Sequence, residues 1–210
     1  MRSIVPATDE LSKRITNTIE YVQEKERSLA ALFVKRGFNF LRLSKPEEAA
    51  QDFDLGITLD AACGIGHLGL GIARISIQET RPQGIKALSL AIKKLTAELS
   101  QDPNQTTLIF RRAQARRFLA LVCPVKTTLF EWRLQSRNSI LGEALADVER
   151  LLLNPHSRID ALAERGLVRV AQDNFAQARE DFDTAMSNER ASTFSRSLLL
   201  AVRLTLQVIT

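Results

Sequence analysis

The chain has 210 residues, of which 45% are hydrophobic and 25% charged, and it carries a formal net charge of +5. These values are typical of a folded globular protein and argue against extended disorder. The N-terminus lacks the apolar core of a secretory signal, and no run approaches the roughly 18 apolar residues of a membrane span. We therefore expect a single cytoplasmic domain that does not enter a membrane.

The N-terminal part of the chain predicts a packed amphipathic helix over residues 8–28. Apolar residues recur there on one face, at intervals of four, four and three: Leu11, Ile15, Ile19 and Val22.

Beyond this helix, two segments far apart in the chain are similar to each other. Residues 36–54 read RGFNFLRLSKPEEAAQDFD, and residues 165–183 read RGLVRVAQDNFAQAREDFD. Each predicts two short helices around a polar turn, so the chain contains an internal helical repeat.

The pattern resembles the tetratricopeptide repeat, a helix–turn–helix unit of about 34 residues. This family has small residues where paired helices approach closely, and an aromatic residue in the second helix. The matching residues are Gly37, Ala49, Phe53 and Gly56 in the first repeat and Gly166, Ala178, Phe182 and Ala185 in the last. The resemblance implies an all-α, irregular tetratricopeptide-like solenoid with about three recognisable helix pairs and additional helices.

We predict one domain whose elements follow in chain order. They are an N-terminal helix (8–28), a first repeat (30–61), a second repeat (64–100), an irregular basic pair or insertion (104–155), a last repeat (159–190) and a C-terminal helix (192–209). An insertion is expected because Gly37 and Gly166 are 129 residues apart, 27 more than three periods of 34. The apolar C-terminal helix is predicted to pack on the last repeat or on a second copy of the chain.

The second repeat contains a glycine motif with two interpretations. Residues 64–69, GIGHLG, fit the G-x-G-x-x-G pattern of a dinucleotide-binding turn and resemble the glycine-rich motif of S-adenosylmethionine-dependent methyltransferases. However, Glu79 follows Gly66 by thirteen residues, where a cofactor site needs about 20. Gly71 follows Gly37 by one period of 34, which predicts the first helix of a second repeat over residues 67–73. Gly64 and Gly66 are then predicted to form a loose turn between repeats.

The remaining candidates for chemistry predict neither catalysis nor metal binding. Carboxylates two residues apart on a helix, as in the two Asp-Phe-Asp triplets, point about 200° apart and cannot share an ion, so we expect these acids to face water. The two histidines show no ligand spacing, and the two cysteines form no C-x-x-C motif: His67, His156, Cys63 and Cys123. We therefore predict no enzyme, no metal and no cofactor.

A basic segment between Pro103 and Gly142 has seven cationic residues against Glu131 alone. They are Arg111, Arg112, Arg116, Arg117, Lys126, Arg133 and Arg137. Three interpretations remain open at this stage. The arginines pair with acids on neighbouring repeats, bind an acidic protein partner, or contact nucleic-acid phosphates while nearby aromatic residues stack on bases.

The resemblance also implies an inner face that binds peptides or helices. Its groove residues would be Val34, Phe38, Leu41, Ala163, Leu167 and Val170. Because they are apolar, the carboxylate-clamp activity of one chaperone-binding subgroup is not carried over. An apolar groove fits an amphipathic helix, either from a partner or from the chain's own N- or C-terminus. We predict a non-catalytic adaptor or scaffold, with a nucleic-acid-binding repeat protein and a methyltransferase as alternatives.

Overall fold

The computed structural model describes residues 5–122 and 130–187, except for the side chains of 5–11 and 130–136. The predicted C-terminal helix at 192–209 and Lys126 lie outside the described residues. The described residues form eight α-helices and one short 3-10 helix, and they contain no strand. The elements are α1 Val5–Arg42, α2 Pro46–Leu59, α3 Gly64–Ser76, η1 Gln78–Thr80, α4 Arg81–Gln101, α5 Thr106–Val122, α6 Phe130–Leu152, α7 Arg158–Ala171 and α8 Phe175–Met186.

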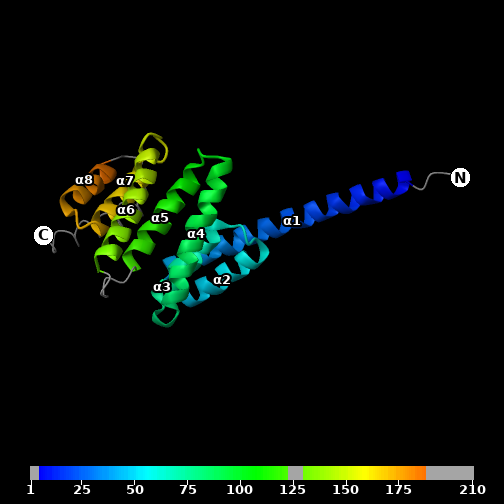
Figure 1. The fold of residues 1–210 in the computed structure, drawn as a ribbon, viewed down its shortest axis with the longest axis horizontal. Helices are drawn as coiled ribbons and strands as arrows, with labels where there is room; N and C mark the ends of the chain where they lie inside the picture. The colour runs from blue at the N-terminus through cyan, green and yellow to red at the C-terminus, as the bar shows by residue number, and fades with distance from the viewer. Residues whose placement is uncertain (1–4, 123–129, 188–210) are drawn as a thin grey trace.

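The helices pair in chain order to form four stacked hairpins, α1/α2, α3/α4, α5/α6 and α7/α8 (Figure 1). Each hairpin packs on the next through α2 with α3, α4 with α5 and α6 with α7. The first helices of the hairpins also contact one another in succession, from α1 to α3, α5 and α7. They therefore form one side of the stack, and the predicted all-α helical-repeat solenoid is confirmed.

The helix α1 combines two elements that the sequence predicts as separate. It runs without a break from Val5 to Arg42, through both the predicted 8–28 helix and the first helix of the first repeat. Residues 12–29 are exposed, and burial begins at Ala30. Figure 1 shows this N-terminal part extending away from the stacked hairpins. The predicted packing of the 8–28 helix is therefore not found for the residues whose side chains are described.

The first and last hairpins have the same turn. Ser44 and Asp173 have φ angles of 56° and 61°, in the left-handed region. The next residue donates its backbone N–H back across the turn, from Lys45 N to Phe40 O and from Asn174 N to Arg169 O, both at 2.9 Å. This bond satisfies a carbonyl at the end of the first helix and allows the chain to reverse within three residues.

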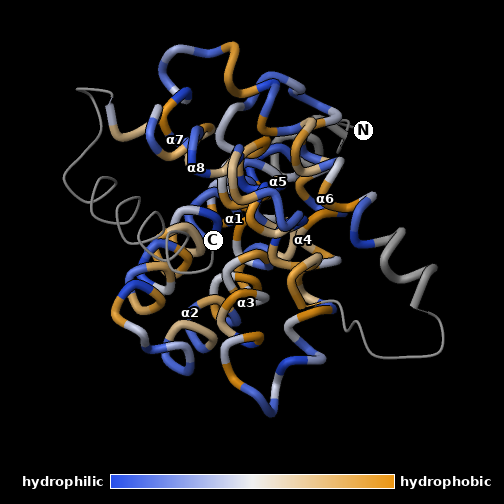
Figure 2. The backbone as a smooth tube through the Cα atoms, turned by 90° about the vertical axis from the view of Figure 1, so that its left-hand side faces the viewer, coloured by the Kyte–Doolittle hydropathy of each residue, from blue (hydrophilic) through white to orange (hydrophobic). Residues whose placement is uncertain are grey.

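The middle of the chain is a regular hairpin rather than an insertion. The helices α5 and α6 pack against each other along their length, and Ala113, Ala144 and Val148 are fully buried. The additional residues are explained by helix length, because α4, α5 and α6 contain 21, 17 and 23 residues against 14 in α2 and 12 in α8. Figure 2 shows hydrophilic and hydrophobic residues interspersed along the helices of the stack.

The glycine motif is helical, so the predicted loose turn at Gly64 and Gly66 is wrong. The helix α3 begins at Gly64, whose backbone N–H donates to Glu98 Oε1 at 3.0 Å. A Cβ on Gly64 would lie 2.7 Å from Leu95 Cγ, so the residue is small because α4 packs against it. The preceding element is the helix α2, whereas a nucleotide-binding glycine turn follows a strand. The motif therefore does not form a cofactor turn.

The predicted close-packing position at Gly71 is confirmed. A Cβ there would lie 2.7 Å from the Leu88 side chain and 3.1 Å from the Leu88 backbone N, so α3 and α4 approach closely. None of the described helices is both long and apolar enough to span a bilayer.

Candidate partner-binding groove

Three hollows on the side formed by the first helices of the hairpins share one lining residue, Arg111 of α5. One of about 750 Å³ lies between α1, α3 and α5. A second of about 480 Å³ extends from α1 across α5 to α7, and a third of about 340 Å³ lies where α5 meets the start of α7. We call these three hollows together the groove. All three hollows adjoin Arg111, and the two larger ones also share Phe38, Leu41 and Gln114 as lining residues.

The Arg111 guanidinium lies among aromatic rings. Its Cζ is 4.9 Å from the ring centroid of Phe38 and 5.9 Å from that of Phe110. Its Nη1 donates to Gln114 Oε1 at 2.9 Å. Burial lowers the pKa of Arg111, an effect partly opposed by the charges of Glu164 and Asp160. No ion pair among the described residues includes Arg111, and the residue remains partly exposed to the groove.

The structure places five of the six predicted groove residues in these hollows. Val34, Phe38 and Leu41 line the largest hollow. Phe38 and Leu41 also line the second hollow, together with Ala163 and Leu167 from α7. The sixth residue, Val170, lines none of the three hollows. It packs instead against the buried cluster around Phe182 between α7 and α8.

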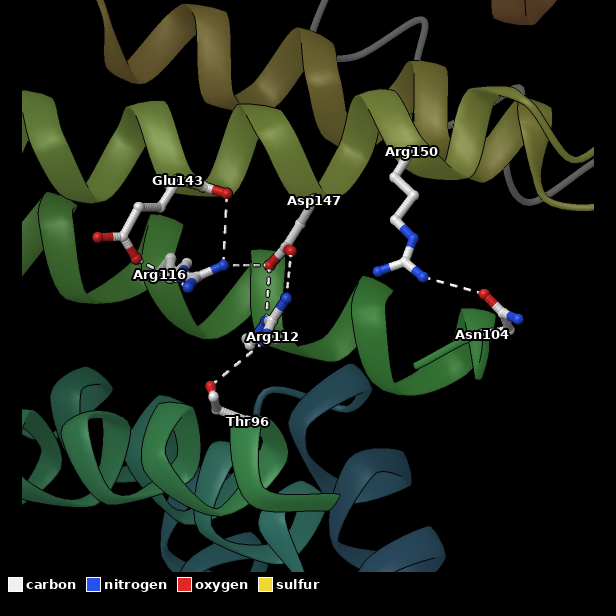
Figure 3. A network of polar contacts seen from close by, with 7 residues as sticks. All are labelled: Thr96, Asn104, Arg112, Arg116, Glu143, Asp147 and Arg150. Carbon is white, nitrogen blue, oxygen red and sulfur yellow. Dashed lines mark hydrogen bonds and ion pairs between the residues drawn. The ribbon is translucent and has the colours of Figure 1, made fainter. Parts of the chain in front are cut away.

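Two arginines of the predicted basic patch pair with one acid on the facing helix (Figure 3). Arg112 Nη2 is 2.6 Å from Asp147 Oδ1, and Arg116 contacts the other oxygen of the same carboxylate. Arg116 also pairs with Glu143 at 2.7 Å. The Arg112 and Arg116 side chains are only 14% and 12% exposed. They therefore join α5 to α6 rather than presenting charge to solvent.

The other members of that patch lie apart. Arg117 Nε is 2.6 Å from Glu164 Oε1, and this buried pair joins α5 to α7. Arg137 donates from Nη2 to the backbone oxygen of Ala171 at 2.6 Å. The side chains of Lys126 and Arg133 are outside the described part of the chain. The four other arginines among the described side chains are bound within the fold, which leaves Arg111 as the described arginine of the patch that has no carboxylate or backbone-carbonyl partner.

A repeated ion pair was not predicted from the sequence. Arg36 pairs with Asp52 in the first hairpin, with Nε–Oδ2 at 2.6 Å. Arg165 pairs with Asp181 in the last hairpin, with Nη2–Oδ1 at 2.6 Å. The prediction that these acids face water is wrong, because Asp52 and Asp181 are each 3% exposed. The sequence feature that could have revealed these ion pairs is their spacing, since the arginine and the aspartate are sixteen positions apart in both repeats.

The third hairpin contains the same pair at a different spacing. Arg112 and Asp147 precede the fully buried Ala113 and Val148, as Arg165 and Asp181 precede Gly166 and Phe182. In both hairpins a second arginine, four residues further on, also contacts the aspartate; these are Arg116 and Arg169. The pattern therefore extends to a hairpin within the segment that the sequence predicts as an irregular basic pair or insertion.

Solved structures of known repeat proteins resemble this arrangement, whereas no family model and no curated protein matches the sequence. TTC0263, a thermophilic TPR protein of Thermus thermophilus, is 15% identical with a TM-score of 0.49, over 84% of this chain and 85% of that one. YrrB, described as a TPR protein with an unusual peptide-binding site, is 17% identical with a TM-score of 0.40, over 90% and 96%. Because both TM-scores are below 0.5, the fold assignment rests on the chain's own hairpins. The described part of the chain forms a solenoid of stacked helical hairpins.

Of the remaining candidates for chemistry, His67 is buried, Cys63 is partly buried and His156 is exposed. His67 is buried in α3, and this burial lowers its pKa. Burial likewise raises the pKa of the Cys63 thiol, whose Sγ accepts from Gly66 N at 3.3 Å and caps α3. His156 lies in the turn before α7, where its backbone N–H donates to Asn154 Oδ1 at 2.9 Å. The described side chains contain no group of three or more potential metal ligands.

Proposed function

We propose that this protein is a non-catalytic adaptor or scaffold that binds a segment of a partner protein in the groove. The observation that carries this proposal is the set of adjoining hollows along α1, α5 and α7, in which apolar side chains surround Arg111. Concave, largely apolar surfaces of this size accept a peptide or the apolar face of an amphipathic helix. Most patch arginines are engaged inside the fold, and this favours a protein partner over nucleic acid.

The chain's own N-terminal helix does not occupy the groove. Residues 12–29 of α1 extend away from the stacked hairpins, and all of them are exposed (Figure 1). Only the later part of α1 lines a hollow, through side chains such as Phe38 and Leu41. Residues 12–29 therefore leave the groove uncovered, which supports the binding of a segment from another protein.

The proposal is tested with two groove variants and one matched control. Leu41→Asp and Leu167→Asp place a charge on opposite sides of the groove. Leu90→Asp makes the same change on α4, where Leu90 is 38% exposed and lines none of the three hollows. Circular dichroism and thermal melts first establish that all three variants are folded.

Proteins captured from a native lysate are then quantified by mass spectrometry for the wild type and each variant. We expect the two groove variants to lose the same bound proteins, and the Leu90→Asp control to retain them. An identical set of bound proteins in all four samples would exclude the groove as the binding surface.

A further inference from the structure

We propose that Arg111 recognises an acidic side chain on the bound segment, an inference that rests on the function proposed above. Arg112, Arg116 and Arg117, its neighbours on α5, all pair with carboxylates inside the fold. Arg111 has no such partner among the described residues, although it is the residue common to the three hollows. Arg111 therefore carries a charge in the groove that no described carboxylate pairs with.

The setting of Arg111 suits carboxylate binding. A guanidinium has five N–H donors, and among the described residues Arg111 uses one of them, in a bond to Gln114. The rings of Phe38 and Phe110 hold the planar group within the groove, which limits the side-chain entropy lost when a ligand binds. Partial burial also weakens competition from water, so a charge-assisted hydrogen bond is stronger here than on an open surface.

The charges around Arg111 favour acid on one side of it. The largest hollow is lined by Lys35, Arg42 and Arg111 and by no carboxylate. Towards α7 the lining includes Glu164, which pairs with Arg117, and the exposed Asp160. A bound segment therefore has its acidic residues over Arg111 and α1, and its apolar residues towards α7. The acids on α7 disfavour a uniformly charged polyanion such as nucleic acid.

The position of Arg111 between hollows also indicates which carboxylate it receives. Two hollows adjoin at Arg111, one of about 750 Å³ lined by α1, α3 and α5 and one of about 480 Å³ that reaches α7. A segment that fills both hollows passes Arg111 with residues before and after the contact. The group recognised is therefore an internal aspartate or glutamate with apolar residues beside it, rather than a chain terminus.

The first experiment selects ligands from a displayed library of random 12-residue peptides. The library is panned in parallel on the full-length wild type, Arg111→Gln, Leu41→Asp and Arg74→Gln. Arg74 is the matched control, because it loses the same charge from α3 at an exposed ion pair with Asp54, away from the groove. Urea unfolding of each variant verifies that the fold is retained.

We expect wild type and Arg74→Gln to enrich peptides that contain an acidic residue beside apolar ones. Arg111→Gln is expected to retain apolar enrichment and lose the acidic preference. An acidic preference that survives in Arg111→Gln, or its absence from the wild type, overturns the Arg111 inference alone. If the wild type enriches no peptides that the Leu41→Asp variant does not also enrich, the proposed groove function fails, and this inference fails with it.

The second experiment measures the pair directly by fluorescence anisotropy. One enriched peptide and its Glu→Gln counterpart are labelled and titrated with wild type and Arg111→Gln. We expect the peptide substitution to weaken wild-type binding about tenfold, because a tenfold change in Kd corresponds to the free energy of about one charge-assisted hydrogen bond. The same substitution is expected to weaken Arg111→Gln binding less than about twofold, since that variant cannot form the bond. Equal weakening in both proteins would refute direct contact. Tighter wild-type binding of a labelled 20-nucleotide single-stranded RNA than of the peptide would also overturn the proposal.

Discussion

The carboxylate of Asp181 is almost fully buried, so its charge has to be compensated by neighbouring side chains. Arg165 and Arg169 both point at it from α7, each with a nitrogen 2.6 Å from a carboxylate oxygen. The two arginines are only 21% and 17% exposed, so removing the acid leaves two poorly hydrated cations close together. The loss of one partner from a buried ion pair is costly even where the intact pair contributes little net stability.

We therefore predict that Asp181→Ala lowers the free energy of unfolding by about 3 kcal/mol. The control Glu180→Ala removes an exposed carboxylate from the adjacent position of α8, and is expected to change stability by less than about 0.5 kcal/mol. Urea denaturation followed by circular dichroism measures both variants. Equal effects of the two substitutions would show that Asp181 makes no special contribution.

At the residue scale, the sequence reveals which residues recur in the two repeats but not the side-chain contacts that they make. The angle between neighbouring carboxylates correctly indicates that Asp52 and Asp54 diverge. It does not indicate what faces each of them, because the partners come from different helices: Arg36 of α1 for Asp52 and Arg74 of α3 for Asp54. A tertiary contact of this kind is visible in sequence only where the spacing recurs, as it does for Arg165 and Asp181.

At the element scale, glycines determine how closely the first hairpins stack. The fully buried ring of Phe53 in α2 lies between two glycines, Gly37 of α1 and Gly69 of α3. A Cβ added at Gly69 would lie 2.2 Å from the ring, and one added at Gly37 would lie 2.9 Å from it. Phe38 packs edge-on against the same ring at 5.1 Å, so the ring has little freedom to move.

Two Gly→Ala substitutions that are expected to change the stability in opposite directions test this packing. Gly69→Ala is expected to destabilise the protein by about 2 kcal/mol, because the added methyl overpacks a buried ring. Gly142→Ala in α6 is expected to stabilise it by about 0.5–1 kcal/mol, because a Cβ there meets nothing within 4 Å and alanine favours the helix. Chemical denaturation provides both values. Stabilisation by Gly69→Ala would contradict the close packing of Phe53.

The element boundaries show where local sequence signals were insufficient. The repeat pattern correctly predicted a helix around Gly71 but not its start at Gly64, because glycines without tertiary context indicate a turn. The break predicted near residue 29 does not occur, since residues 28–32, SLAAL, contain no glycine or proline to end α1. Both differences arise because local propensity was interpreted without the packing of neighbouring helices.

At the scale of the whole molecule, stability is expected to be uneven along α1. Its exposed residues 12–29 contribute no buried side chain, whereas residues from Ala30 onward pack into the first hairpin. An isolated helical segment of this length is marginal in water, so its hydrogen bonds open locally without unfolding the hairpins.

Hydrogen exchange measured by mass spectrometry should resolve this difference within one helix. Amides of residues 12–28 are expected to exchange at least about tenfold faster than those of residues 32–42. Equal protection of both segments would contradict an uncovered N-terminal half of α1. Repeating the measurement at several protein concentrations would then show whether a second copy provides the protection.

The overall architecture was more predictable than the groove. Repeated Gly and Phe positions were sufficient to predict an all-α solenoid, because the residues that pack each hairpin lie within that hairpin's own stretch of sequence. The convergence of three hollows on Arg111 depends on α1, α3, α5 and α7 lying side by side. This arrangement joins residues from Ala31 to Leu167, and a local pattern contains no information about it.

The buried pair between Arg117 and Glu164 has a consequence for how such a chain can evolve. The pairs that bury Asp52, Asp147 and Asp181 each lie within one hairpin, so they accompany that hairpin in any duplication or rearrangement. The Arg117–Glu164 pair instead joins two hairpins. Exchanging the α5/α6 hairpin alone would leave Glu164 buried without its cation, and exchanging the α7/α8 hairpin alone would leave Arg117 buried without its acid. Repeat shuffling is therefore restricted at this junction, and the last two hairpins are expected to be inherited together.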